Sequence, residues 1–350
     1  MEKKKNLIYF YTHNRLLTRN VKIINTLKEF FNVCVREPIV KVGMINFSPK
    51  VMVGLATLNL IFNLSHIENS LNFIDGRILP IFSPQFNKID IIDYPTPVHE
   101  ELPYMRMGYL SKFSLIAERT IISKSKLIIV PNEPLKRLVL SYGAQNVIKI
   151  PNYPPKSFKP TVDAEEFKEK LGLTGYDKIA IFVGRWRLRE IYGLDLLIES
   201  WKYVESEVPD SLLIIVGPSK RAKDFTKNKL ERYLEKRGIS NYIVTGEVNY
   251  KELPNWINIA DVCLAPRTST FPKSWYNDED STKISEYAAL RKPIVATNYL
   301  PSKRYYLTQP NPKAFANGIL KAFMGLIPKP EPKFWEENVP KLIRSILDII

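Results

Sequence analysis

The sequence predicts an α/β protein of two doubly wound domains, each built on a parallel sheet, that face a central cleft. Three observations support this fold class. Short runs that are apolar throughout alternate with segments of helical spacing, which is typical of parallel strands covered by helices on both faces. The chain has 350 residues, which is enough for two domains. A segment with four prolines, residues 151–160, separates the two halves as a linker would.

The second half shows the alternation most clearly. Three of its strand-like runs end in glycine, at residues 178–184, 211–217 and 241–246. Glycine lets backbone and ligand approach closely, and ligands of doubly wound sheets bind at the carboxyl ends of the strands. The other expected elements are strands at 262–265 and 293–297 and helices at 194–204, 221–237, 250–260 and 282–290.

The first half repeats this pattern less regularly. It opens with an expected strand at 7–11 and an expected helix at 21–31. Further strands are expected at 32–35, 91–93, 126–130 and 147–150, and further helices at 107–123 and 134–142.

The domain boundaries follow from the breaks in this pattern. We expect an N-terminal domain over 1–154 and a C-terminal domain over 155–326, joined by the proline-rich segment. After Gly325, Pro328 and Pro330 break the chain before a last expected helix at 335–350. We expect this C-terminal segment, 327–350, to pack back towards the N-terminal domain.

The charge of the chain favours an anionic partner. It carries 51 Lys and Arg against 36 Asp and Glu, a formal net charge of +15. The first 154 residues hold 20 basic and 11 acidic residues, an excess of +9, and the rest hold the remaining +6. Such a field suits nucleic acid, an anionic lipid surface or a phosphorylated small molecule, or it is simply a solvated lysine-rich surface. The chain has no zinc-finger spacing, RNA-binding run or basic helix with heptads, so we expect no nucleic-acid partner.

Other features exclude further classes of protein. Cys34 and Cys263 lie in strand-like apolar runs, and we expect both to be buried thiols. No cysteine–histidine cluster has metal-ligand spacing, so no metal site is expected. The longest apolar stretch, 51–64, is too short to span a bilayer, and the N-terminus lacks the apolar run of a signal peptide. We therefore expect a cytoplasmic protein, in which residues 51–64 and 104–110 either join the core or touch the cytoplasmic face of a membrane.

Several strings of the second half, in their order and spacing, resemble the donor domain of GT-B glycosyltransferases, most closely the retaining glycosyltransferase family 4 (group 1). They are Phe182-Val-Gly-Arg185, Gly193-Leu-Asp-Leu-Leu-Ile-Glu-Ser200, Leu212-Leu-Ile-Ile-Val-Gly217, Val244-Thr-Gly246, Glu252-Leu-Pro254, Ala260-Asp-Val-Cys-Leu-Ala-Pro266 and Ser281-Thr-Lys-Ile-Ser-Glu286 with the ten residues after it. The resemblance covers residues 125–300 well and the rest by architecture. It implies two Rossmann-like domains and a nucleoside-diphosphate-sugar donor, a UDP- or GDP-sugar, with no cofactor.

The resemblance assigns roles to the expected helix at 282–290. Glu286 matches the glutamate that binds the ribose of the donor, and a carboxylate can accept hydrogen bonds from two vicinal hydroxyls. Thr282 and Lys283 stand at the start of the helix, where backbone N–H groups and the helix dipole suit a diphosphate. Ser281 replaces the usual proline of this motif. Asp278 takes the place of an earlier glutamate near the transferred sugar, or belongs to an acidic solvated loop.

The phosphate site departs from the family pattern after the first glycine-ended strand. Arg185 matches an arginine that pairs with the donor phosphates, and with Lys283 it is expected to stabilise the leaving diphosphate during catalysis. The lysine that usually follows is missing, and the stretch 186–192 is longer than usual. Arg187 or Arg189 can supply the second charge, or both belong to a solvated basic loop.

The glycines that close the strands form the remaining part of the predicted donor site. Gly184 and Gly217 are expected beside the donor, and Thr245 and Gly246 beside its nucleobase, through backbone groups.

The N-terminal domain offers fewer catalytic candidates. Asp93 and His99 resemble an acid and a histidine that many members carry near the reacting carbon, or they belong to a loop shaped by two prolines. Arg19 resembles an arginine that begins the first helix in part of the family. His13 and Arg15 precede it in a loop that lacks the usual glycines.

Together these features predict a retaining, metal-independent glycosyltransferase. Its expected acceptor is a glycan or a polyprenyl- or lipid-linked molecule, with possible peripheral contact at a membrane. Three alternatives stay open: a nucleotide-sugar epimerase of the same fold, a non-catalytic scaffold, and a nucleic-acid binder suggested by charge alone.

Overall fold

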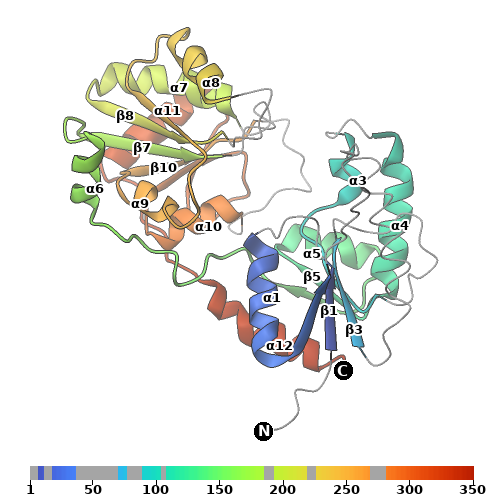
Figure 1. The fold of residues 1–350 in the computed structure, drawn as a ribbon. Coiled ribbons are helices and arrows are strands. Elements are labelled where there is room, and N and C mark those ends of the chain that lie inside the picture. The colour runs from blue at the N-terminus through green and yellow to red at the C-terminus, as the bar shows by residue number, and fades with distance from the viewer. Residues whose placement is uncertain are drawn as a thin grey trace, which may run out of the picture. The chain divides into compact units, whose positions relative to one another are not determined.

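The chain forms two compact units in the computed structural model (Figure 1). The first comprises residues 1–152 and 335–350, and the second residues 153–334. The division therefore lies two residues before the expected linker boundary and eight residues after the expected start of the C-terminal segment. The residues that the structure describes are 7–11, 18–36, 70–76, 89–103, 108–184, 193–218, 226–268 and 281–350.

The first unit contains a parallel sheet whose described strands run in the order β2-β1-β3-β4-β5-β6. Side chains alternate between its two faces, so that Phe73 and Ile91 enter one core while Ile74 and Ile92 enter the other. Both faces are therefore buried, which explains why these strands are apolar throughout. The strands are β1 (Leu7–Tyr11), β2 (Asn32–Arg36), β3 (Ser70–Asp75), β4 (Ile91–Asp93), β5 (Leu127–Val130) and β6 (Val147–Lys149).

Helices cover both faces of this sheet. On one face, Ile23 and Leu27 of α1 pack with Trp335 and Leu342 of the C-terminal segment. The indole nitrogen of Trp335 donates a hydrogen bond to Thr26 Oγ1 at 2.9 Å, which fixes that segment on the first unit. On the other face lie α4 and α5. The helical elements are α1 (Thr18–Phe30), α3 (Val98–Glu101), η5 (Gly108–Leu110), α4 (Ser111–Lys124), α5 (Glu133–Ser141), η8 (Trp335–Asn338) and α12 (Val339–Leu347).

The second unit contains a parallel sheet in the order β12-β11-β10-β7-β8-β9. From β7 the chain builds outward through β8 and β9, then returns to the other side of β7 and builds outward through β10, β11 and β12. This is the doubly wound order of dinucleotide-binding folds. The strands are β7 (Lys178–Val183), β8 (Ser211–Val216), β9 (Tyr242–Gly246), β10 (Val262–Ala265), β11 (Ile294–Thr297) and β12 (Tyr306–Thr308).

Two hydrophobic cores enclose this second sheet. α7, α8 and α11 cover one face, with Trp201 and Phe315 fully buried there. α9 and α10 cover the other, with Tyr287 fully buried. The helices are α6 (Ala164–Leu171), α7 (Leu194–Glu207), α8 (Lys227–Glu235), α9 (Leu253–Asn258), α10 (Thr282–Ala289) and α11 (Pro312–Phe323).

The two cysteines differ in burial. Cys263 on the central strand β10 is buried, as expected. Cys34 is only half-buried, because β2 stands at the edge of its sheet. Within the described part of the chain, no helix is long and apolar enough to cross a membrane. Residues 51–64 and 104–107 lie outside that part.

Candidate functional site

The strand order of the second sheet reverses between β7 and β10, and this is where a doubly wound sheet offers a crevice for ligands. The pairing of these two strands runs through Ala180–Val262 and Ile181–Cys263. Beyond these pairs, Tyr287 of α10 connects the two strands. Its hydroxyl accepts a hydrogen bond from Val183 N at 2.8 Å and donates to Leu264 O at 3.4 Å. Burial raises the pKa of Tyr287 well above its usual value, so the hydroxyl stays protonated. The tyrosine thereby fixes α10 to both strand ends.

Helix α10 begins with a serine cap at this crevice. The Ser281 hydroxyl accepts a hydrogen bond from Ile284 N at 3.4 Å. Serine is a preferred N-cap residue, which explains how Ser281 can stand in place of the proline of the related motif. The cap places Thr282 and Lys283 in the first helical turn and Glu286 in the second. The side chain of Thr282 is exposed, and Glu286 is only 6% exposed.

Lys283 lies at the carboxyl end of β7. Its ammonium nitrogen stands 3.9 Å from the centre of the buried Phe182 ring. Gly184 lies against the same ring, since a Cβ there would come within 2.6 Å of it. Burial, followed by repulsion from Arg267, lowers the pKa of Lys283 to about 7, although Glu286 acts in the opposite direction. A cation held in this way gains from an anion placed beside it.

Arg267 is a second cation at this crevice, and it was not predicted from the sequence. It follows β10 and is 4% exposed. Its guanidinium carbon lies 3.6 Å from the centre of the Tyr299 ring. Thr297 Oγ1 accepts a hydrogen bond from Arg267 N at 2.8 Å and donates to Arg267 O at 2.7 Å, which fixes the backbone of this residue. The signal available in the sequence was a basic residue two positions after the end of a buried strand.

Glu286 interacts with Lys283 and with Tyr250, which belongs to an aromatic pair. Its charge favours the protonated form of Lys283. It also raises the pKa of Tyr250, after burial, through its charge and a side-chain hydrogen bond. The Tyr250 ring packs against Phe158 with 5.3 Å between ring centroids. The carboxylate is therefore placed between a lysine and a tyrosine that follows β9.

The strand-end glycines meet at the same edge of the sheet. Gly217 N donates a hydrogen bond to Gly246 O at 2.8 Å, and both glycines have positive φ. Thr245 Oγ1 donates to the same carbonyl at 2.9 Å. At the start of α7, Gly193 has a φ of 67°, and a Cβ there would lie 3.0 Å from the Pro266 side chain. The chain after β7 thus comes close to the chain after β10. The predicted residues Arg185, Arg187, Arg189 and Asp278 lie outside the described residues.

The corresponding edge of the first sheet is also rich in charged groups. Asp93 ends β4 and is fully buried. Both of its carboxylate oxygens accept hydrogen bonds from Arg19 at 2.8–2.9 Å. The same guanidinium donates to Ile150 O at 2.7 Å and to Asn152 Oδ1 at 2.8 Å. This pair joins the start of α1 to β4 and to the end of the first unit's chain before the linker.

His99 stands beside a buried glutamate that the sequence analysis did not single out. Glu118 of α4 is fully buried, and its carboxylate accepts hydrogen bonds from His99 N at 2.7 Å and Ser114 Oγ at 2.8 Å. It also accepts one from the Tyr94 hydroxyl, and it lies 2.9 Å from His99 Nδ1. Nδ1 bound to a carboxylate leaves Nε2 as the ring's remaining functional nitrogen. Glu118 is thus a positioning residue for His99.

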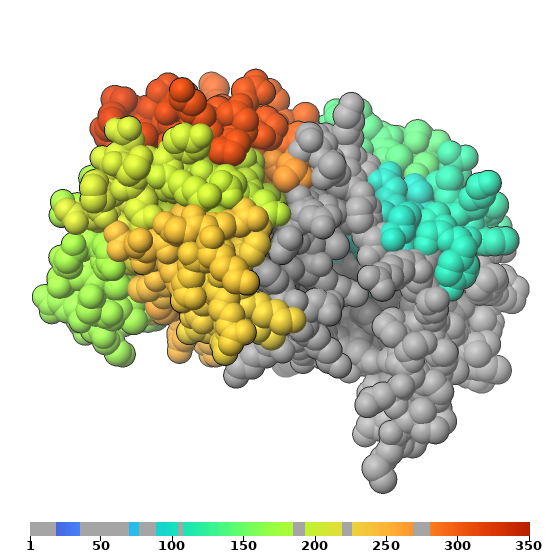
Figure 2. Space-filling view, turned by 90° about the horizontal axis from the view of Figure 1, so that it is seen from above, coloured from blue at the N-terminus to red at the C-terminus, as the bar shows by residue number. Residues whose placement is uncertain are grey.

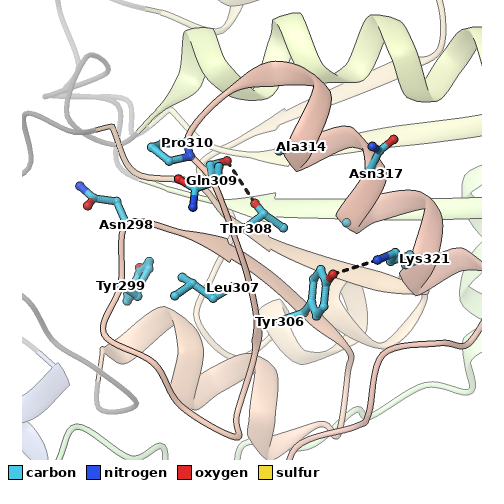
Figure 3. Close-up of a pocket in the computed structure, with 11 residues that line it drawn as sticks. Asn298, Tyr299, Tyr306, Leu307, Thr308, Gln309, Pro310, Ala314, Asn317 and Lys321 are labelled. Carbon is cyan, nitrogen blue, oxygen red and sulfur yellow. Dashed lines mark hydrogen bonds between the residues drawn. The ribbon is translucent and has the colours of Figure 1, made fainter.

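A separate depression of about 550 Å³ lies along β12 and α11 (Figure 3). Tyr306 and Lys321 point towards each other across it and share a hydrogen bond of 3.0 Å. The depression touches Tyr299, which carries Arg267 on its ring, but its lining includes none of the predicted donor residues. Within the described ranges, no group of three or more histidine, cysteine, aspartate or glutamate side chains is arranged to hold a metal ion.

Comparison with known proteins finds a family model that is similar to most of the second unit. Residues 177–324 match the sequence model of the glycosyl transferases group 1 family, which confirms the predicted resemblance at that level. No curated protein matches the sequence. The match includes β7 to α11, and therefore every residue described above at the crevice of the second sheet except Phe158.

Solved structures of glycosyltransferases share the fold over the full chain. Sucrose-phosphate synthase from Thermosynechococcus elongatus has a TM-score of 0.69 at 14% identity, with 99% of this chain and 100% of that chain covered. HepE from Anabaena in complex with UDP and glucose gives 0.68 at 14% identity, with 98% and 99% covered. α,α-Trehalose 6-phosphate synthase from Burkholderia multivorans gives 0.62 at 9% identity, with 99% of each chain covered. The predicted fold class, GT-B with two Rossmann-like domains, is confirmed.

Proposed function

We propose that this chain, whose second unit matches the model of the group 1 glycosyl transferases, moves a sugar from a nucleoside-diphosphate sugar to a glycan or lipid-linked acceptor. We further propose that the transfer retains the anomeric configuration and needs no metal. The observation that carries the proposal is the pair of cations, Lys283 and Arg267, beside Glu286 where the order of the second sheet reverses. HepE, which has the same fold, has been solved with UDP and glucose.

In this proposal, each group at the crevice has a separate task. Glu286 accepts hydrogen bonds from the ribose hydroxyls. Lys283, Arg267 and the N–H groups at the start of α10 hold the diphosphate. Gly184 leaves room beside the Phe182 ring, because any side chain there would meet the ring. The donor thus binds by positive charge and backbone groups.

The chemical step needs the leaving diphosphate to be stabilised as the bond to the sugar breaks. Fixed cations in a partly dry site do this more effectively than the same charges in water, because they need no reorganisation during the reaction. Arg185 is proposed to add a further charge there. His99, with its ring set by Glu118, is proposed to act on the transferred sugar. Asp93, which is fully buried and paired with Arg19, is proposed to hold that arginine in place.

Calorimetric titration of the full chain with UDP, GDP and ADP, with and without EDTA, tests the proposal. We expect saturable binding of one nucleotide that EDTA leaves unchanged and that Glu286→Ala weakens at least tenfold. Glu165→Ala removes a glutamate from the exposed side of α6 and serves as the matched control. If no nucleotide binds to the folded protein, or if both variants behave alike, the proposal is wrong.

Two further assays separate the alternatives: turnover of a nucleotide sugar with and without an acceptor, and titration with nucleic acid at several salt concentrations. An epimerase also binds a nucleotide sugar, but it consumes the sugar without an acceptor. A scaffold binds no nucleotide or turns none over. A nucleic-acid binder shows affinity that falls steeply with salt, and Glu286→Ala does not affect it.

A further inference from the structure

One helix of the first unit exposes an apolar stripe. The side chains of Tyr109, Phe113 and Ile116 are 63%, 58% and 64% exposed, and they follow one another at spacings of four and three residues. Such spacing places them along one side of the helix. The opposite side of α4 is buried in the core through Ile121 and Ile122. Large apolar side chains gathered on one helix face are unusual at a surface that meets only water.

The exposed charges on this helix itself are all positive. Lys112, Arg119 and Lys124 are exposed on the same helix. At about 100° per residue, Lys112 and Arg119 lie beside Phe113 and Ile116 on the helix surface. The sequence from residue 108 to residue 126 contains a single acid, Glu118, and that side chain is fully buried. An apolar stripe that shares its helix with exposed cations is complementary to an anionic surface with an apolar interior.

We propose that this face of α4, with Tyr109, docks on the surface of a membrane that contains anionic phospholipid. The aromatic and aliphatic side chains would enter the boundary between headgroups and acyl chains, and the cations would contact lipid phosphates. Figure 2 shows this part of the chain, in turquoise, at the surface of the molecule. The proposed membrane contact is argued only from the exposed side chains of α4 and Tyr109. Only its use, to bring a lipid-linked acceptor to the enzyme, rests on the proposed function.

Another part of the described chain exposes apolar side chains that also have lysines near them in the sequence, but these side chains do not lie along one side of a helix. Met324 and Leu326, at the end of α11, are 69% and 67% exposed. They are as exposed as the stripe on α4, but they lie on a turn and follow one another at a spacing of two residues. They provide a matched control for the loss of two exposed apolar side chains.

Sedimentation of the full chain with phospholipid vesicles tests the docking surface. We expect binding to phosphatidylcholine vesicles that contain phosphatidylglycerol, and weaker binding to pure phosphatidylcholine or at high salt. Phe113→Ser with Ile116→Ser should weaken binding about tenfold or more. Met324→Ser with Leu326→Ser should leave it unchanged. All four side chains are exposed, so thermal melts of the variants should match the wild type.

A second pair of variants tests the charges. Lys112→Gln with Lys124→Gln should weaken binding to the anionic vesicles only, while Lys236→Gln with Lys251→Gln, two exposed lysines of the second unit, should not. The proposal is overturned if the wild type ignores anionic vesicles or if the α4 variants bind like their controls. It is also overturned if the α4 variants change the self-association of the free protein instead.

These measurements are independent of the donor site. The nucleotide titration is run without vesicles, and the Phe113→Ser, Ile116→Ser variant should bind nucleotide normally. Vesicle sedimentation is run without nucleotide, and Glu286→Ala should bind vesicles normally. If one proposal fails, the other is still supported or overturned by its own measurement.

Discussion

The carboxyl edges of the two sheets arrange their charges in opposite ways. On the first sheet, Arg19 faces Asp93 in a buried bidentate pair, so opposite charges satisfy each other within the protein. On the second sheet, Arg267 lies close enough to Lys283 to lower the pKa of the lysine, so two like charges stand together. Like charges at a strand edge cost stability unless an anion joins them. The first edge is thus built for stability, and the second is built for an anionic ligand.

The largest expected effect is on stability at the first edge. Arg19→Met should lower the free energy of unfolding by about 3–5 kcal/mol, because it leaves the buried Asp93 carboxylate without its cation. Urea unfolding followed by circular dichroism measures the change. Lys28→Met, which removes an exposed cation from the same helix, should change stability by about 0.5 kcal/mol or less. Similar losses in the two variants would show that the pair does not hold this edge.

A smaller effect is expected from pH at the second edge. The pKa of Lys283 is lowered to about 7, and a bound diphosphate would raise it again. Binding then takes up a proton above pH 7, so affinity should fall by up to about tenfold for each pH unit until the pKa of the bound form is reached. Titration with UDP-glucose or GDP-mannose between pH 6 and pH 9 measures this, since the diphosphate of a nucleotide sugar does not titrate in that range.

Lys283→Arg is the control for the pH dependence. A guanidinium stays protonated over the whole range, so the fall in affinity above pH 7 should disappear in this variant. A fall of the same size in Lys283→Arg, or an affinity that does not change with pH in the wild type, would contradict the assignment of the proton to Lys283.

Much of the fold could be predicted because most strands are buried on both faces and are therefore apolar throughout. Strand β3 was missed, because Ser70 and Asn72 interrupt its apolar pattern. Strand β12 is short and partly exposed, so it leaves little signal. Helix α11 was also missed, although Asn311 caps it and Pro312 begins it, a recognisable start.

The candidate site was only partly predictable. Motif spacing led to Lys283 and Glu286, which the structure places in the first two turns of one capped helix. Nothing local connects Glu118 with His99, because they are 19 positions apart and only the packing of α4 brings them together. An acid on the buried side of an apolar helix was the available signal. Placing Arg267 at the crevice required the strand order, which shows that β10 ends beside β7.

The central claim is that the crevice between β7 and β10 binds a nucleoside diphosphate. The most direct measurement compares the affinity of Lys283→Met and Lys321→Met for that nucleotide by calorimetry. Lys321 is a cation of the same unit that lines the depression along β12. The account predicts a loss of about a hundredfold or more for Lys283→Met and no change for Lys321→Met. The reverse result would place the nucleotide in the depression and contradict the account.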